Sequence, residues 1–484
     1  MTTVPTVPTG NELNRNDISE TMKELRDYSN IYFVGAGGIG MAALERYFLS
    51  LGKNVAGYDR TPSALTDALA KEGVDITFKD SVSEIPQSMT DCKNTLVIYT
   101  PAVPADNSIY RFFVDGGFTV IKRAAALGMI TRSSKAICFA GTHGKTTTSS
   151  MCAHIMQVAG VGSNAFLGGI QRNYGSNLLL SKTSPWSVIE ADEYDRSFHH
   201  LRPYIAVVTS TDPDHLDIYG NEEAYLESFA HFTSLIVPGG TLVVHTGLKL
   251  RPRLAPGVKT VTYARDEGDF HAANIRREEG RIVFDFVGPN LYISDIEPEE
   301  PIEINIENAI AAGTAAWLTG NVTPEAIKKA ISTFKGAERR FQFHLKESSG
   351  KRRAIIDDYA HHPDELRASI QSVKALYPTR KLTVAFQPHL YSRTRDFADE
   401  FANALSLADR VVLLDIYPAR EEPIEGVTSK IIFDKINIAE KKLIDKKDFA
   451  KTIKSCKFDI LLTAGAGDIN LFLPEIVSDA INNQ

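Results

Sequence analysis

An apolar segment that runs straight into a glycine-rich loop and then into a helical pattern constrains this chain more than any other feature. The segment is residues 136–160, AICFAGTHGKTTTSSMCAHIMQVAG. A buried strand, a glycine loop and a helix in this order present backbone N–H groups to a phosphate. The loop matches G-x-x-G-K-[ST], although the full G-x-x-x-x-G-K spacing would need glycine where Phe139 stands. The pattern therefore predicts a shortened phosphate loop.

The side chains of this loop are those of an ATP site. A lysine after the second glycine holds the β- and γ-phosphates, and the hydroxyl that follows it binds Mg²⁺. We assign these roles to Lys145 and Thr146. The predicted ATP-binding residues of the loop are Gly141, Thr142, His143, Gly144, Lys145, Thr146 and Thr147.

A second strand–glycine–helix pattern lies earlier, in residues 31–52, IYFVGAGGIGMAALERYFLSLG. Its G-x-G-x-x-G loop allows a tight turn and a close approach of the backbone to a diphosphate, and Asp59 stands where a ribose-binding acid is expected. Alone, the pattern suggests a nicotinamide or flavin enzyme, but any nucleotide diphosphate presents the same charge. A tight turn without a ligand is the alternative. The loop residues are Gly35, Ala36, Gly37, Gly38, Ile39 and Gly40.

Two acidic clusters follow predicted strands, IEADEYD at residues 189–195 and TDPDHLD at 211–217. The carboxyl ends of parallel strands form the ligand crevice of an open sheet. Carboxylates beside an ATP loop suit Mg²⁺, so we predict Glu190 and His215 as metal-binding residues together with Thr146. Helix capping is the alternative, and for Asp212 and Asp217 it explains the sequence at least as well.

Two further polar segments follow apolar strands, DDYAHHPDE at residues 357–365 and FQPHLYSRTRDF at 386–397. Their histidines have no zincin spacing and no cysteine nearby, so a zinc site is not indicated. Arg393 and Arg395 can each bind a carboxylate or phosphate through two N–H groups. A surface salt bridge is the alternative for either arginine.

With 484 residues the chain is too long for one core. Alternating apolar runs and helical stretches predict an α/β protein of three domains, each built on a mostly parallel sheet with flanking helices. We expect a disordered tail (1–27), a Rossmann-like domain (28–132), a P-loop-type central domain (133–336) and a Rossmann-like C-terminal domain (337–484). Segments 259–264, 270–288 and 291–297 predict a small antiparallel side sheet in the central domain, and 304–320 a helix. The lysine-rich run 441–451 is interpreted as a solvated helix face.

Composition limits the classes of function. Hydrophobic residues at 43% and a net charge of −7 are ordinary for a globular protein and give no sign of a nucleic-acid or membrane surface. The four cysteines lie far apart without a C-x-x-C pair, which favours free thiols in a reducing compartment. No apolar run has membrane-spanning length, and the N-terminus lacks the pattern of a signal peptide. We therefore expect a cytoplasmic protein.

The ordered set of motifs resembles the Mur ligase family of ATP-dependent amide-forming enzymes. Its pieces are GAGGIGM, GTHGKTTT, EADE, DPDHLD, DDYAHHP and FQPHLYSRTRDF, and the resemblance runs from about residue 28 to about residue 475. It implies that the first domain binds a UDP-sugar, the second ATP and Mg²⁺, and the third the amino acid as it closes over the site. The first glycine loop then needs no nicotinamide.

The resemblance also implies roles for individual residues. Lys145, Glu190, His215 and Arg340 match the catalytic group that holds the phosphates and metal ions. Asn305 and Asn308 match the adenine side, Tyr359 and His361 further ATP-side positions, and His389, Tyr391 and Arg393 the amino-acid side. Ile304 stands where the family usually has histidine, and Leu390 replaces an expected arginine.

Residues 216–233 contain no lysine, whereas ligases acting later in the pathway have one shortly after the metal-binding histidine. This fits the type of Mur ligase that joins L-alanine to UDP-N-acetylmuramate with ATP. We expect the protein to be a monomer or a weak homodimer. Three alternatives fit the sequence less well. A ligase that recycles a murein tripeptide is disfavoured by FQPHLYSRTRDF. A nicotinamide-dependent dehydrogenase leaves the second loop and the acidic clusters unexplained. A non-catalytic nucleotide sensor does not need the lysine, threonine and carboxylate set.

Overall fold

The computed structural model describes residues 24–214, 216–278, 281–346, 353–419 and 421–482. The chain divides into two compact units, Met1–Ser133 and Ser134–Gln484, and each is described by itself. Most of the expected tail, residues 1–23, lies outside the described residues, while Leu25–Asp27 form the short 3-10 helix η1 with Leu25 buried. No helix within the described ranges is long and apolar enough to cross a membrane.

The first unit is a five-stranded parallel sheet in the order β3-β2-β1-β4-β5. The three central strands β2, β1 and β4 are buried along most of their length, as parallel strands between helices must be. The strands are β1 Asn30–Val34, β2 Asn54–Tyr58, β3 Asp75–Thr77, β4 Thr95–Tyr99 and β5 Thr119–Lys122. The helices are α1 Ile39–Ser50, α2 Ala64–Glu72, α3 Ser108–Asp115 and α4 Arg123–Arg132, with 3-10 turns η2 Val82–Glu84 and η3 Gln87–Thr90.

The second unit opens with a seven-stranded sheet in the order β12-β11-β10-β6-β9-β7-β8, parallel except for β8. Helices α5, α8 and α9 share one large apolar cluster with it, which includes Phe139, Ile155 and Ile310. The strands are β6 Lys135–Ala140, β7 Asn164–Gln171, β8 Ser176–Leu179, β9 Trp186–Glu190, β10 Pro203–Val208, β11 Thr241–His245 and β12 Lys259–Tyr263. The helices are α5 Lys145–Val158, α6 Leu216–Tyr219, α7 Glu222–Ser234, α8 Glu303–Trp317 and α9 Pro324–Ile331, with η4 Tyr194–His200.

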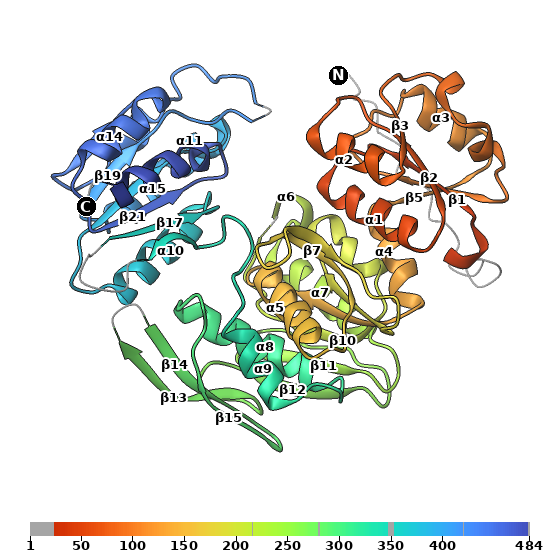
Figure 1. The fold of residues 1–484 in the computed structure, drawn as a ribbon, viewed down its shortest axis with the longest axis horizontal. Helices are drawn as coiled ribbons and strands as arrows, with labels where there is room; N and C mark the ends of the chain where they lie inside the picture. The colour runs from red at the N-terminus through yellow and green to blue at the C-terminus, as the bar shows by residue number, and fades with distance from the viewer. Residues whose placement is uncertain (1–23, 215, 279–280, 347–352, 420, 483–484) are drawn as a thin grey trace, which may run out of the picture. The chain divides into compact units, whose positions relative to one another are not determined.

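A three-stranded antiparallel sheet, β13 His271–Glu278, β14 Arg281–Gly288 and β15 Leu291–Ile296, packs against α8 and α9 (Figure 1). The side sheet is therefore confirmed for two of its three expected segments. Segment 259–264 was wrongly placed in it, because Lys259–Tyr263 pair with β11 in parallel. The long connection from β11 permits this parallel pairing, whereas an antiparallel neighbour would follow a tight turn.

The chain ends in a six-stranded sheet in the order β16-β17-β21-β18-β19-β20, parallel except for β16. Separate apolar clusters cover its two faces. The strands are β16 Gln342–Lys346, β17 Ala354–Asp358, β18 Leu382–Phe386, β19 Arg410–Leu413, β20 Lys441–Leu443 and β21 Ile460–Ala464. The helices are α10 Pro363–Leu376, α11 Tyr391–Asp396, α12 Ala398–Leu405, α13 Lys430–Phe433, α14 Phe449–Ser455 and α15 Leu473–Asn482, with η5 Lys446–Asp448 and η6 Ile469–Phe472.

The expected fold class, α/β with mostly parallel sheets, is confirmed. The lysine-rich run 441–451 is not one helix face. Lys441–Leu443 form an edge strand against β19, and helix α14 begins only at Phe449. The buried stripe that a helix needs starts at Phe449 and continues through Ala450 and Ile453.

Candidate active site

The predicted phosphate loop lies between β6 and α5. Gly141 has φ +143°, and a Cβ there would lie 2.1 Å from Thr209 Oγ1 at the end of β10. Gly144 has φ +82° and forms the N-cap of α5, whose first residue is Lys145. Both conformations favour glycine because L side chains clash there. The loop thus depends on its two glycines for its turn and for the close approach of the neighbouring strand.

Lys145 is held at the loop by a buried carboxylate. Its Nζ donates to Gly141 O at 2.6 Å and to Glu193 Oε1 at 2.8 Å. The Glu193 side chain is 2% exposed, and its Oε2 has no partner among the described residues. Burial raises the pKa of Glu193, and the charge of Lys145 opposes that rise. Sequence reasoning noted Glu193 in its acidic cluster but gave it no role, since no local signal ties it to the loop lysine.

Thr146 and Glu190 form an oxygen-lined group beside the loop. Thr146 Oγ1 donates to Glu190 Oε1 at 3.1 Å, and Gly168 N donates to Glu190 Oε2 at 3.0 Å. A Cβ on Gly168 would lie 2.3 Å from that oxygen, so the carboxylate fills a space that only glycine leaves open. Burial raises the pKa of Glu190, while Lys145 and the bond from Thr146 lower it. Glu190 is therefore no helix cap.

A hydroxyl and a carboxylate at a phosphate loop are the hard oxygen donors that Mg²⁺ takes, so these residues fit that ion. His215, predicted as the third metal-binding residue, lies outside the described residues. Within the described ranges, no group of three or more histidine, cysteine or acidic side chains could hold a metal ion by itself.

The two predicted adenine-side asparagines line one buried hydrogen-bond chain from α8 to the loop. Asn308 Oδ1 accepts from Thr148 Oγ1 at 3.1 Å, and Asn308 Nδ2 donates to Asn305 Oδ1 at 3.1 Å. Asn305 Nδ2 in turn donates to Glu300 O at 3.3 Å. A Cβ on Gly144 would lie 3.0 Å from Asn308 Oδ1, so α8 approaches the loop directly.

A cavity of about 570 Å³ brings most of the predicted ATP residues together. It is lined by loop residues 142–147, Glu190, Ile304 and Arg340, and by Asp358 and the first turns of α10. A smaller adjoining cavity of about 170 Å³ shares Gly144, Ile304 and Arg340 with it and adds Asn305 and Asn308. The residues predicted for the phosphates and those predicted for the adenine therefore line adjoining cavities, whose walls come from both large sheets of the second unit and their connections.

Arg340 is the cation that enters this cavity from the junction between those sheets. Its side chain is exposed, and its guanidinium has no hydrogen-bond or ion-pair partner in the described part of the chain. It lies 5.6 Å from the centre of the Tyr359 ring. Burial raises the pKa of Glu190 and of Asp358, and the charge of Arg340 opposes both rises. Arg340 also adds to the effect of His361, which lowers the pKa of Glu365 against burial. An exposed, partnerless guanidinium is available to a phosphate.

The third group lies beyond Tyr359, where the rings of His361 and His389 are 6.0 Å apart. Burial lowers the pKa of His389 to about 4, with His361 and Arg393 adding to the shift, and burial also lowers the pKa of His361. Arg393 has no ion-pair partner among the described residues. Both histidines are neutral at neutral pH, and Arg393 is the positive charge beside them.

Further along α11, Arg395 pairs with Asp396 at 2.7 Å on the surface. The salt-bridge alternative is therefore correct for Arg395 and not for Arg393. Tyr391 is the first residue of α11 and is half-buried, and Leu390 before it has φ +70°. His362 is the N-cap of α10, where its Nδ1 accepts from Asp364 N.

In the first unit the glycine loop is braced by Asp59. Gly37 N donates to Asp59 Oδ2 at 2.6 Å, and a Cβ on Gly37 would lie 2.9 Å from the same oxygen. Gly38 is the N-cap of α1. The guanidinium of Arg123 lies over the first turn of that helix, 3.0 Å from the position of a Cβ on Gly40. A role of Asp59 toward a ribose stays a prediction.

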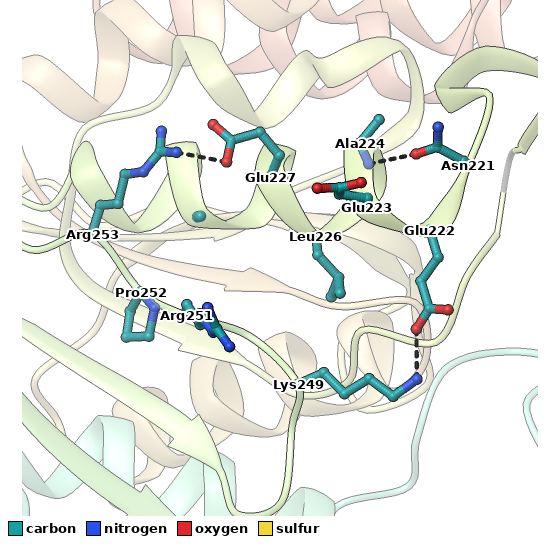
Figure 2. Close-up of a pocket in the computed structure, with 11 residues that line it drawn as sticks. Asn221, Glu222, Glu223, Ala224, Leu226, Glu227, Lys249, Arg251, Pro252 and Arg253 are labelled. Carbon is teal, nitrogen blue, oxygen red and sulfur yellow. Dashed lines mark hydrogen bonds and ion pairs between the residues drawn. The ribbon is translucent and has the colours of Figure 1, made fainter.

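A separate hollow of about 1230 Å³ lies between α7 and the segment before β12 (Figure 2). Figure 2 shows two ion pairs in its lining, Lys249 with Glu222 at 2.7 Å and Arg253 with Glu227 at 2.6 Å. None of the predicted site residues lines it. Size alone therefore does not locate the active site.

The fold and the cavity define a nucleotide-binding enzyme of the α/β type with a phosphate loop. Three family models match the chain: "Mur ligase family, catalytic domain" at residues 30–135, "Mur ligase middle domain" at 139–316, and "Mur ligase, glutamate ligase domain" at 339–474. The chain is 56% identical to the UDP-N-acetylmuramate–L-alanine ligase of Parabacteroides distasonis over 92% of its length and 96% of the relative. It is 53% identical to that of Phocaeicola vulgatus over 94% and 98%.

Solved structures agree. A UDP-N-acetylmuramate–alanine ligase from Thermotoga maritima has a TM-score of 0.74 and 27% identity, covering 94% of this chain and all of that one. A murein peptide ligase from Psychrobacter arcticus has a TM-score of 0.61 at 20% identity, over 94% and 99%, and shares the fold. The chain belongs to the Mur ligase family.

Proposed function

We propose that this protein joins L-alanine to the carboxylate of UDP-N-acetylmuramate, with ATP converted to ADP and phosphate, as an early cytoplasmic step of peptidoglycan precursor synthesis. The observation that carries the proposal is the convergence of Lys145, Glu190 and the partnerless Arg340 on one cavity. The choice of substrates rests on the two relatives named above, which are UDP-N-acetylmuramate–L-alanine ligases and match this chain over nearly their whole length. The protein acts as a monomer or weak homodimer.

A carboxylate is a poor electrophile, so it must be activated before an amine can attack it. A carboxylate oxygen attacks the γ-phosphorus of ATP, the bond to ADP breaks, and an acyl phosphate forms. The neutral amine of alanine then attacks the acyl carbon, and the tetrahedral intermediate loses one amine proton and expels phosphate to leave the amide. Catalysis of the first step depends on placing the groups in line and neutralising the phosphoryl oxygens.

The residues of the second unit meet these needs. Lys145 and the N–H groups of its loop hold the β- and γ-phosphates, and Arg340 faces the same oxygens from the opposite lining of the cavity. Thr146 Oγ1 and Glu190 would hold Mg²⁺, together with His215. When bound, Mg²⁺ neutralises phosphate charge. Asn305 and Asn308 contact the adenine side.

The remaining substrates occupy the other predicted sites. Residues 35–40 and Asp59 of the first unit hold the UDP-sugar, the glycine loop taking its diphosphate at the N-terminus of α1. Arg393 receives the carboxylate of alanine, beside His361, His389 and Tyr391, and Tyr359 lies between this group and Arg340. Because His361 and His389 are neutral, the charge offered to that carboxylate is the guanidinium.

A phosphate-release assay tests the proposal. With ATP, Mg²⁺ and UDP-N-acetylmuramate, we expect release to depend on L-alanine and not on the murein tripeptide. Lys145→Ala should lower turnover by at least ~10²-fold, the effect of losing one preorganised stabilising group. Binding of UDP-N-acetylmuramate, measured by calorimetry, should survive in this variant. Tripeptide-dependent release would instead identify a recycling ligase.

A further inference from the structure

Two strained residues flank Arg340. Arg339 has φ +58° and Phe341 has φ +49°, both in the left-handed region that bulky side chains avoid. Such strain persists only where surrounding contacts over-determine the backbone. The three residues connect the seven-stranded sheet to β16, so the strain is concentrated at the junction that carries the phosphate-facing arginine.

The junction is fixed to the seven-stranded sheet just before these residues. Arg172 N donates to Gly336 O at 3.0 Å, and Glu338 N donates to Ile170 O at 2.9 Å. A β-bridge joins Gln171 to Ala337 between those two bonds. The backbone of residues 336–338 is therefore held against the end of β7, which sets the direction in which the chain continues to Arg339.

The guanidinium of Arg339 fixes the junction to the six-stranded sheet. It donates to Asp357 Oδ2 at 3.1 Å, to Gly467 O at 2.7 Å and to Gly465 O at 2.5 Å. Asp357 is fully buried and also accepts from Thr463 Oγ1 at 2.6 Å. The backbone takes part as well, since Tyr359 N donates to Arg339 O at 2.6 Å.

The neighbouring arginines therefore do different things. The Arg339 guanidinium donates its hydrogen bonds to β17 and to the segment after β21, and its side chain is only 16% exposed. Arg340 makes no such bond within the described residues and lines the cavity. Both guanidinium groups lie near the Tyr359 ring, at 5.2 Å for Arg339 and 5.6 Å for Arg340.

We propose that Arg339 is a positioning residue for phosphoryl transfer. Its bonds to Asp357, Gly465 and Gly467 hold the left-handed turn that directs the Arg340 guanidinium into the ATP cavity. The same bonds seat the six-stranded sheet, so Arg340 reaches the phosphates only when that sheet is in place. This inference rests on the proposed function, in which Arg340 contacts the phosphates of ATP.

A double-mutant cycle in the full chain tests it, because residues that act as a unit are non-additive. Arg340→Ala should lower kcat by ~10²-fold or more. Arg339→Ala should lower kcat by at least ~10-fold, with KM for UDP-N-acetylmuramate within about twofold of wild type. Adding Arg339→Ala to Arg340→Ala should then change kcat by less than about threefold.

Further variants separate positioning from stability. Arg410 is a matched control, since it also binds a carboxylate, Glu440, and a backbone carbonyl, Lys457 O, in the same sheet. Arg410→Ala should leave kcat unchanged. Arg339→Asn tolerates a positive φ but cannot reach the carbonyls, so it should lose as much kcat as Arg339→Ala. If Arg339→Ala does not fold, Asp357→Asn replaces it in the cycle.

The outcomes separate the positioning role of Arg339 from the proposed contact of Arg340 with the phosphates. If Arg340→Ala lowers kcat but the losses multiply in the double variant, Arg339 does not act through Arg340 and the inference falls alone. A lower Tm with unchanged kcat in Arg339→Ala would overturn the inference in the same way. If Arg340→Ala leaves kcat unchanged, the proposed contact of Arg340 with the phosphates falls and takes the inference with it.

Discussion

At the residue scale, the two cations assigned to the phosphates are prepared in different ways. Lys145 is already paired with the buried Glu193 and with a loop carbonyl, so its ammonium group is held where the phosphates are expected. The Arg340 guanidinium has no hydrogen-bond or ion-pair partner in the described part of the chain, and left-handed residues on either side of it set the course of its backbone. The desolvation free energy of a half-buried lysine is partly offset when its ammonium group is paired with a carboxylate. An exposed arginine has little desolvation free energy to offset.

The first residue-scale prediction concerns Glu190. Its carboxylate and Thr146 Oγ1 are the oxygens proposed as Mg²⁺ ligands within the described residues. Glu190→Ala should therefore raise the Mg²⁺ concentration for half-maximal activity by at least ~10-fold. Calorimetry of Mg²⁺–ATP binding gives a second measurement that does not depend on turnover. Unchanged Mg²⁺ dependence in both measurements would reduce Glu190 to a structural role.

Gly168→Ala extends this prediction without removing the carboxylate. The new Cβ would come within 2.6 Å of three atoms of the Glu190 carboxyl group and force it away from Thr146. We expect the Mg²⁺ requirement to rise in the same direction as for Glu190→Ala. Gly175→Ala is a control for backbone strain, since that glycine has φ +62° on the following turn but nothing lies near its Cβ position. Wild-type behaviour of Gly168→Ala would show that Glu190 can hold metal from another position.

The next prediction concerns the amino-acid end. Arg393 is the charge beside the neutral His361 and His389, since Leu390 replaces the second arginine. Arg393→Lys keeps the charge but loses the planar fork, so KM for L-alanine should rise by roughly tenfold, about 1.4 kcal/mol. KM for ATP should move much less. Arg395→Lys, at a surface ion pair, is the control. A rise confined to the KM for ATP would place Arg393 on the phosphates instead.

At the scale of elements, helix α5 is tied to its neighbours by a buried histidine. His154 Nδ1 lies 2.6 Å from Tyr174 Oη in the turn after β7, and Nε2 lies 3.1 Å from Thr333 Oγ1 after α9. Burial lowers the pKa of His154 to about 4. The imidazole is therefore neutral in the folded protein, and it joins α5, which carries Lys145, to the turn after β7 and to the segment after α9.

This gives a prediction about acid stability. The unfolded chain binds a proton at His154 near pH ~6.5 but the folded chain only near pH 4, so stability falls as pH drops through that window. The shift corresponds to a loss of ~2 kcal/mol at pH ~5. His154→Gln should remove this part of the pH dependence, measured by urea unfolding at pH ~7 and pH ~5. The exposed His200→Gln is the control. An equal loss in the free energy of unfolding between pH ~7 and pH ~5 for His154→Gln and wild type would contradict the lowered pKa of His154.

At the scale of the whole molecule, the proposed function places the substrate sites in two units that have their own cores. The first unit packs its own apolar cluster around its sheet. The residues that line the ATP cavity all lie in the second unit. Such a division suits a reaction of three substrates, because closure can then assemble a complete site only when all are bound.

The division predicts that residues 134–484, expressed alone, bind ATP with an affinity near that of the full chain. Its apolar clusters and its phosphate loop need no residue from the first unit. Calorimetry with ATP and with UDP-N-acetylmuramate checks this, and the fragment should bind only the first. A fragment that folds by circular dichroism but does not bind ATP would show that the first unit completes the ATP site.

The amino-acid sequence by itself determined the local features of this protein. The phosphate loop could be predicted because strand, glycines, lysine and helix are neighbours in the chain, and their geometry follows from backbone sterics. The α/β class followed from the alternation of apolar runs and helical patterns. That Glu190 would lie near the loop followed from one rule, that parallel strands end at the same edge of a sheet.

The tertiary structure decided what depends on residues far apart in the chain. Pairing with β11 made Lys259–Tyr263 a parallel strand, although its local pattern suits either kind of sheet. Glu193 became the partner of Lys145, and Arg395 paired on the surface while Arg393 did not. The sequence does not distinguish the two adjacent arginines of one motif, yet Arg339 is bound to the sheet and Arg340 faces the cavity. Burial, partners and backbone strain at such positions arise from packing between segments, which local propensity does not encode.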